Sequence, residues 1–159
     1  MKPRSKRRRG NALIELALAT TLMVPILIGT FEFGYTFYVY NLLSTQVRGG
    51  SRYASFRTFR CQDAASVAKY KAAIRNMVRT STPDGSGALI IPGLTDANVL
   101  VEIIDQNGVA ADNAHTPATV TVSAVNFALY SVFATMRVHE KPSVTFPYLG
   151  RYAPAETEP

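Results

Sequence analysis

The sequence has a single cysteine, Cys61, and therefore cannot form an intramolecular disulfide. One thiol is compatible with a reducing or an oxidising compartment, so the cysteine content does not indicate where the protein resides. We interpret Cys61 as a small apolar side chain rather than as a reactive or intermolecular thiol.

Sequence patterns of known catalytic and metal sites are also missing. His115 and His139 are far apart in the sequence, and neither has a second cysteine or a paired carboxylate at metal-ligand spacing. The chain has no Gly-x-Ser-x-Gly elbow, phosphate-binding loop or dinucleotide fingerprint. The run 84–87, Asp-Gly-Ser-Gly, resembles a calcium loop only superficially, and we interpret it as a turn. We therefore predict no catalytic residue, no metal and no cofactor.

Excess positive charge is absent beyond the first ten residues. The formal net charge is +6, but six of the 17 Lys and Arg lie within the first nine residues, and the remaining cations balance the 11 Asp and Glu. These six cations are Lys2, Arg4, Lys6, Arg7, Arg8 and Arg9. A nucleic-acid partner needs basic charge spread over a surface, so none is predicted.

Charge is nearly absent from residues 12–31, where Glu15 is the one ionisable side chain. About 20 apolar residues in a helix span about 30 Å, the hydrocarbon thickness of a bilayer. The preceding cations predict a cytoplasmic N-terminus by the positive-inside rule. Aromatic residues typical of the outer membrane interface follow: Phe31, Phe33, Tyr35, Phe37, Tyr38 and Tyr40. We predict a single-pass protein of the cytoplasmic membrane, with its C-terminal domain outside the cytoplasm.

A cleaved secretory signal is disfavoured. The apolar run is longer than the usual h-region of about 7–15 residues, and no Ala-x-Ala site follows it. A twin-arginine signal at residues 7–9 is weaker still, because arginines beside an apolar segment are common in membrane anchors.

Gly10 and Glu15 stand at the junction of the basic leader and the apolar helix. Glu15 could simply reach the cytoplasmic headgroups or pair with Arg8 or Arg9. However, a basic leader, a glycine, four residues and a glutamate form a layout that resembles a type IV prepilin. That resemblance implies cleavage by a membrane prepilin peptidase after Gly10, with Asn11 as the new amino terminus. It also implies that Glu15 of one subunit pairs with the freed amine of a neighbour, as a charge inside a membrane requires a partner.

Residues 7–55 resemble a TadE-like protein, a pseudopilin of the Tad (tight adherence) pilus systems. The resemblance is carried by RRRGNALIELAL at 7–18, Val24-Pro25, the step Glu32-Phe33-Gly34, Tyr38-Val39-Tyr40, and the stretch 46–54 with Arg48, Gly50 and Arg52. The chain departs from the family in having Gln46-Val47 in place of the usual pair of small residues and Ser51 in place of alanine. Leu16 stands where Tad major pilins have tyrosine, which favours a minor subunit. The implied partners are a prepilin peptidase, other pilins or pseudopilins, the pilus assembly platform and the lipid bilayer.

Plainer interpretations of these residues are available. Pro25 is a position for a helix kink, which membrane helices tolerate. Arg48, Arg52 and Arg57 form one basic stripe, which we interpret as solvated or facing lipid phosphate rather than as a docking surface. Gly49-Gly50 is a weak point of the predicted helix.

The predicted organisation has four parts: a basic cytoplasmic leader at 1–10, a transmembrane and extended helix at 11–59, an extracytoplasmic α+β domain at 60–150 and a tail at 151–159. Asp63 is expected to cap a second helix at 64–81, with Val67, Tyr70, Ile74, Met77 and Val78 on one face. Strands are predicted at 98–105, 118–125, 136–139 and 143–146, with a turn at Asn107-Gly108. We interpret residues 127–136 as a short helix or as a connection pressed against lipid. The fold class is α+β, with a long helix, a second helix and one antiparallel sheet of three or four strands.

The predicted function is that of a non-enzymatic minor pilin or pseudopilin in the assembly of a Tad-type pilus. One alternative is a membrane-anchored extracytoplasmic domain that binds a ligand or an envelope component, with Gly10 and Glu15 accidental. A secreted enzyme with an uncleaved anchor is a third, which the missing site residues disfavour. Removal of the leader separates the first from the other two.

Overall fold

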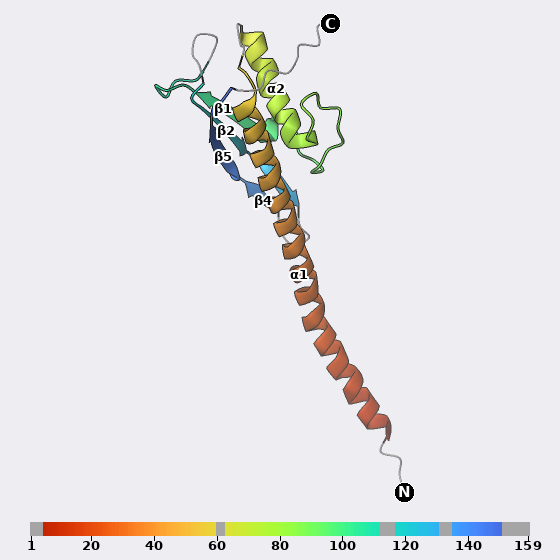
Figure 1. Cartoon of the computed structure of the whole chain (residues 1–159). Helices are drawn as coiled ribbons and strands as arrows, with labels where there is room; N and C mark the ends of the chain where they lie inside the picture. The colour runs from red at the N-terminus through yellow and green to blue at the C-terminus, as the bar shows by residue number, and fades with distance from the viewer. Residues whose placement is uncertain (1–4, 60–62, 112–116, 131–134, 151–159) are drawn as a thin grey trace.

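The computed structural model describes residues 5–59, 63–111, 117–130 and 135–150. A long N-terminal helix carries an α+β domain on its C-terminal half (Figure 1). The elements are α1 (Ser5–Phe56), α2 (Ala64–Thr80), a 3-10 turn η1 (Asp96–Asn98), β1 (Val99–Ile104), β2 (Thr119–Ala124), β3 (Phe127–Tyr130), β4 (Thr135–Val138) and β5 (Ser143–Pro147). The predicted fold class is confirmed. Cys61, His115 and the predicted tail 151–159 lie outside the described residues.

Helix α1 begins within the basic leader at Ser5 and ends at Phe56, near the predicted end at Phe59. It continues through Pro25, which lacks an amide hydrogen and so leaves one carbonyl without its usual helical donor. It also continues through Gly49-Gly50, so the weak point predicted there is not a break in the helix. Packing against the domain explains this continuity, because Gly50 is buried.

The main sheet has three antiparallel strands in the order β1-β2-β5. The register places Val101 opposite Val122, and Val122 opposite Val144. Residues of β1 alternate between buried and exposed, which gives the sheet one face toward the core. On the other face, the hydroxyls of Thr121 and Thr145 share a hydrogen bond of 2.8 Å. The prediction of two strands around 98–105 and 118–125 is confirmed.

A second, two-stranded sheet pairs β3 with β4, and Leu129 lies opposite Met136. Residues 127–136 were predicted to form a short helix or a connection pressed against lipid, and for the described part of that segment the structure shows strands instead. The sequence of this segment is mostly apolar and lacks the polar/apolar alternation with a period of two that a half-buried strand would show. In the structure, Phe127 and Leu129 are buried while Tyr130 is exposed, so the tertiary contacts select the strand.

The hydrophobic core lies between the helices and the main sheet. Helix α1 contributes residues at helical spacing, Val39, Leu43, Val47 and Ala54, which are all buried. Helix α2 begins at the N-cap Asp63, whose side chain accepts a hydrogen bond from the Ser66 amide, as predicted. Its buried face includes Tyr70, Ile74 and Val78, while Val67 is partly buried. The first core residue of α1 is Val39, so the N-terminal half of α1 is left outside the domain.

Candidate functional site

The candidate site is the N-terminal half of α1 and the end of the domain from which it emerges. Residues 10–28 of α1 are exposed along their whole length (Figure 1). This part of the helix is long and apolar enough to cross a membrane by length and composition. A soluble monomer rarely exposes an apolar surface of this extent. We conclude that this segment is suited to membrane anchoring.

Threonine hydroxyls within this segment are satisfied by the helix itself. Thr21 Oγ1 donates to the Ala17 carbonyl at 2.7 Å, and Thr30 Oγ1 donates to the Ile26 carbonyl at 2.9 Å. Thr20 Oγ1 donates to the carbonyl of Leu16 in the same way. In hydrocarbon each polar group must find such an internal partner, so these threonines are compatible with a lipid environment.

Glu15 differs from these threonines. Its side chain is exposed, and no donor among the described residues pairs with it. A carboxylate near the end of a membrane helix needs water, a headgroup or a partner chain to offset its desolvation. The geometry therefore leaves Glu15 available to a group outside the domain.

Gly10 and Asn11 are exposed and lie inside α1 rather than before it. A Cβ at Gly10 would meet nothing within 4 Å, so packing does not require glycine at this position. Glycine in a helix interior costs about 0.5–1 kcal/mol relative to alanine, which weakens the helix locally. This weakness would favour local unwinding around residue 10.

The step Glu32-Phe33-Gly34 lies where α1 meets the domain. Glu32 is half-buried, while Phe33 is exposed and stacks on Phe37 with 6.4 Å between ring centroids. A Cβ at Gly34 would meet nothing within 4 Å. Of these three residues, Glu32 is thus the one that the domain partly covers.

The predicted motif residues of the stretch 46–54 have two different environments. Arg48 and Arg52 are exposed, and the Arg52 guanidinium lies 6.0 Å from the ring centroid of Phe56. Gly50 is buried, and a Cβ there would stand 2.4 Å from Cγ2 of Val78. Gly50 is thus the position at which α1 and α2 approach each other, and the two arginines lie on the exposed side of α1.

Two serines that sequence reasoning did not select connect α1 to β5. The Ser51 hydroxyl donates to the Val144 carbonyl at 3.1 Å and to the Val47 carbonyl at 2.9 Å. The Ser55 hydroxyl donates to the carbonyl of Pro147. In the sequence, Ser51 is distinguished only by its departure from the family's alanine. That departure was the available signal, because a hydroxyl on a buried helix face needs an acceptor.

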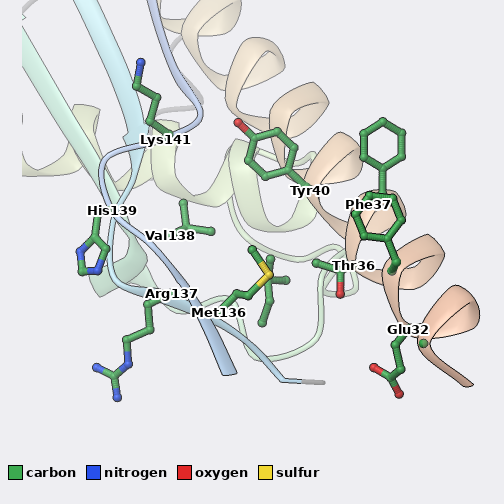
Figure 2. A pocket seen from close by; sticks show the side chains of 12 residues that line it. Glu32, Thr36, Phe37, Tyr40, Met136, Arg137, Val138, His139 and Lys141 are labelled. Atoms are coloured by element: carbon green, nitrogen blue, oxygen red, sulfur yellow. The ribbon is translucent and has the colours of Figure 1, made fainter. Parts of the chain in front are cut away.

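A cavity of about 540 Å³ lies between α1 and β4 (Figure 2). Helix α1 contributes Gly29, Glu32, Phe33, Thr36, Phe37 and Tyr40, and the second sheet with the residues after it contributes Leu129, Met136, Arg137, Val138, His139 and Lys141. Figure 2 shows Met136 and Val138 directed toward α1, with Arg137 and His139 on the opposite side of β4. The volume is within the range of about 300–1,000 Å³ that is usual for ligand sites.

The described residues include no group of three or more His, Cys, Asp and Glu that could hold a metal ion. His139 is exposed at the end of β4. Nucleophilic and general-base side chains are not brought together among the residues discussed above.

Comparison with protein-family models gives a match to the TadE family, described as TadE-like protein, over residues 10–52. The matched range covers most of α1 and includes each of the predicted motif residues from Gly10 to Arg52. The resemblance to a TadE-like protein of the Tad system is thereby confirmed for this segment. Neither the curated proteins nor the solved structures gave a match. The match suggests a protein associated with Tad pili.

Proposed function

We propose that this chain is a non-enzymatic minor pilin or pseudopilin that takes part in the assembly of a Tad-type pilus. The observation that supports it best is the coincidence of the TadE-like match with the part of the chain that the domain leaves uncovered. Residues 10–28 are matched by the family and are exposed in the structure. A helix of this kind buries its surface in lipid and against the helices of other subunits.

In this proposal, a prepilin peptidase cleaves after Gly10 at the cytoplasmic face of the inner membrane. The basic leader holds the N-terminus on the cytoplasmic side, as the positive-inside rule requires. Because Gly10 is exposed and in a helix, the first turns of α1 unwind to present an extended backbone to the peptidase. The family match begins at Gly10, next to the proposed junction, which is consistent with this processing.

Cleavage creates a free amine at Asn11, one helical turn from Glu15. The Glu15 carboxylate of one subunit then pairs with the amine of a neighbouring subunit in the membrane or the assembling pilus. Each subunit offers one such carboxylate and one such amine, so the pairing extends from subunit to subunit. It neutralises both charges in an environment where an isolated charge is costly.

The domain, proposed to comprise residues 60–150, lies outside the cytoplasm and presents contacts to other pilins or to the assembly platform. Arg48 and Arg52 are exposed on α1 just before it enters the loop to α2, and they are available for such contacts. The leader charges and the one candidate span among the described residues support this orientation.

The test is the N-terminal residue of the mature protein, measured by mass spectrometry of the membrane fraction from cells that contain the peptidase. We expect a chain that begins at Asn11, and we expect Gly10→Leu to remain full length. Gly49→Leu is the matched control, because Gly49 is also an exposed glycine of α1 with open space around it. An intact Met1 in the wild-type chain would contradict the proposal and would leave the alternative of an anchored binding domain.

A further inference from the structure

We propose that the end of the β3–β4 sheet that carries Tyr130 rests on the bilayer surface at which α1 leaves the membrane. The domain then contacts lipid at two places, through α1 and through this sheet end, and its orientation on the membrane is fixed. The inference depends on insertion of α1 in the membrane, which the proposed function also requires, but on neither leader cleavage nor a role in a pilus.

The level of the sheet end along α1 provides the first argument. Tyr130 lines a small cavity together with Tyr35 and Thr36 of α1, so these residues lie at the same level. The apolar run of residues 12–31 ends at Phe31, and the helix rises about 7.5 Å from there to Thr36. The polar layer of a bilayer extends roughly 5–8 Å beyond the hydrocarbon. With residues 12–31 in the hydrocarbon, Tyr130 therefore lies at the level of the lipid headgroups.

The direction of the sheets provides the second argument. In the main sheet, Ile104 pairs with Thr119 at one end and Val99 pairs with Ala124 at the other. Strand β3 follows the second end, and the β3–β4 sheet is the part of the described domain that extends farthest toward the N-terminal half of α1 (Figure 1). The turn after β1, which contains Val109, follows the first end. The domain thus has one end close to the membrane and one end away from it.

The exposure of the sheet end provides the third argument. Tyr130 is 79% exposed, as much as Phe31 of the apolar run at 77%. At the other end of the same strand pair, Phe127 and Val138 are buried in the core. A sheet of two strands is only marginally stable by itself and needs a surface to pack on. The described part of the chain supplies that surface at the Phe127 end, and lipid supplies it at the Tyr130 end.

Lipid is the occupant that the position favours over a partner protein. Phe33 and Tyr35 of α1 are exposed beside Tyr130, so the aromatic side chains of two elements gather at one level. Tyrosine has an apolar ring and a polar hydroxyl, which suits the interface between hydrocarbon and water. A partner protein or a second copy would have to displace the headgroup layer that already surrounds an inserted α1. The surface is also continuous with the helix that is suited to membrane anchoring.

The experiment exploits the absence of tryptophan from the chain, because one introduced tryptophan reports on its own position alone. The full chain is reconstituted in nanodiscs, one chain in each, with lipids brominated on the upper part of the acyl chain as quenchers. Val109→Trp is the matched control, since Val109 is exposed at the far end of the domain. We expect quenching of Tyr130→Trp to exceed that of Val109→Trp by at least about twofold, because interfacial rings reach the upper acyl chains.

A second probe leaves Tyr130 in place and tests whether that side chain holds the sheet on the lipid. Thr135→Trp reports from β4, where Thr135 is exposed and pairs with Tyr130. Adding Tyr130→Asp should lower the quenching of this probe, because a carboxylate is costly at the interface, whereas adding Val109→Asp should not. Circular dichroism of each variant confirms that the domain is folded.

Two outcomes would overturn the proposal. The first is equal quenching, or no quenching, at positions 130 and 109, which would leave the sheet end in water. The second is quenching of Thr135→Trp that Tyr130→Asp does not change, because the introduced ring alone would then account for the lipid contact. With one chain in each nanodisc, contact with a second copy cannot produce the expected result.

The two proposals can fail separately, because mass spectrometry of the same samples gives the N-terminus of the chain. A chain that begins at Met1 and shows quenching at position 130 would contradict the pseudopilin proposal while supporting this one. A chain that begins at Asn11 and shows no quenching there would do the reverse.

Discussion

Gly50 of α1 lies directly against Val78 of α2, and a Cβ at residue 50 would stand 2.4 Å from Cγ2 of that valine. Ile74 is part of the same contact, since its carbonyl oxygen would be 3.5 Å from the added Cβ. This contact fixes how closely the second helix packs on the first. The adjacent Gly49 faces open space, so the two glycines of the pair have different structural roles.

The first prediction follows from this contrast. Gly50→Ala should lower the free energy of unfolding of the domain by about 1–3 kcal/mol, because an extra methyl is forced into a packed contact. Gly49→Ala should leave stability unchanged or raise it by up to about 1 kcal/mol, since alanine is the better helix former. Urea unfolding in detergent, followed by circular dichroism, measures both. Equal effects of the two variants would contradict the assigned packing. Combining Gly50→Ala with Val78→Ala should recover part of the free energy of unfolding that Gly50→Ala loses.

The second prediction concerns the serine that joins α1 to β5. Ser51→Ala removes the hydrogen bond to the Val144 carbonyl and should lower the free energy of unfolding by about 0.5–1.5 kcal/mol. Thr45→Ala is the control, because its hydroxyl donates only to the Asn41 carbonyl on an exposed part of α1. Hydrogen exchange at β5 should increase in the first variant and not in the second. Unchanged exchange in both would show that Ser51 does not hold the strand.

The third prediction concerns Glu15. In the proposed assembly, Glu15→Gln removes the charge that pairs with the amine of a neighbouring subunit. We expect co-purification with partner pilins to fall by at least about tenfold, because the amine is left without its counter-charge in lipid. Glu15→Asp retains the carboxylate and should preserve part of the association. Both variants should still be found in the membrane fraction and be cleaved normally, so a loss of cleavage would indicate a different role for Glu15.

The fourth prediction concerns the acid stability of α2. The hydrogen bonds from the Ser66 hydroxyl and then the Ser66 amide hold the pKa of the Asp63 carboxyl below its ordinary value of 3.8. The folded-state pKa is lower than the unfolded one, so this cap stabilises the domain above the unfolded pKa. The contribution is lost as the pH falls through the lowered folded-state pKa. Asp63→Asn keeps a capping oxygen but does not titrate, so its unfolding midpoint should depend less on pH below about 4.

A comparison of unfolding midpoints at pH 7 and pH 3 tests this prediction. The wild-type midpoint should fall more than that of Asp63→Asn. Asp84→Asn serves as a comparison, because the pKa of Asp84 is also lowered, by hydrogen bonds from the Ser86 hydroxyl and amide, but in a loop. Identical pH dependence of the wild-type chain and Asp63→Asn would exclude Asp63 as a source of acid sensitivity.

The local features of this protein were determined by the sequence. The apolar run of residues 12–31 requires a helix with an apolar surrounding, because only a helix satisfies its backbone within one segment in lipid. Asp63 predicted the start of α2, because a carboxylate at an N-cap accepts the otherwise unpaired amide of Ser66. Residues 119–124 alternate between polar and apolar side chains, which is sufficient to predict β2.

Other features depended on contacts between distant segments. Residues 127–136 are mostly apolar and do not alternate with a period of two, so β3 and β4 were set by their pairing with each other and by burial of Phe127 and Leu129. The division of the strands into two sheets likewise follows from pairing partners rather than from local sequence. The role of Gly50 could not be predicted from its neighbours in the sequence. Glycine is required there because Val78 of another helix lies where a side chain would be. The cavity is the clearest case, since Thr36 and Met136 are a hundred residues apart in the chain and become its two walls only when β4 packs beside α1.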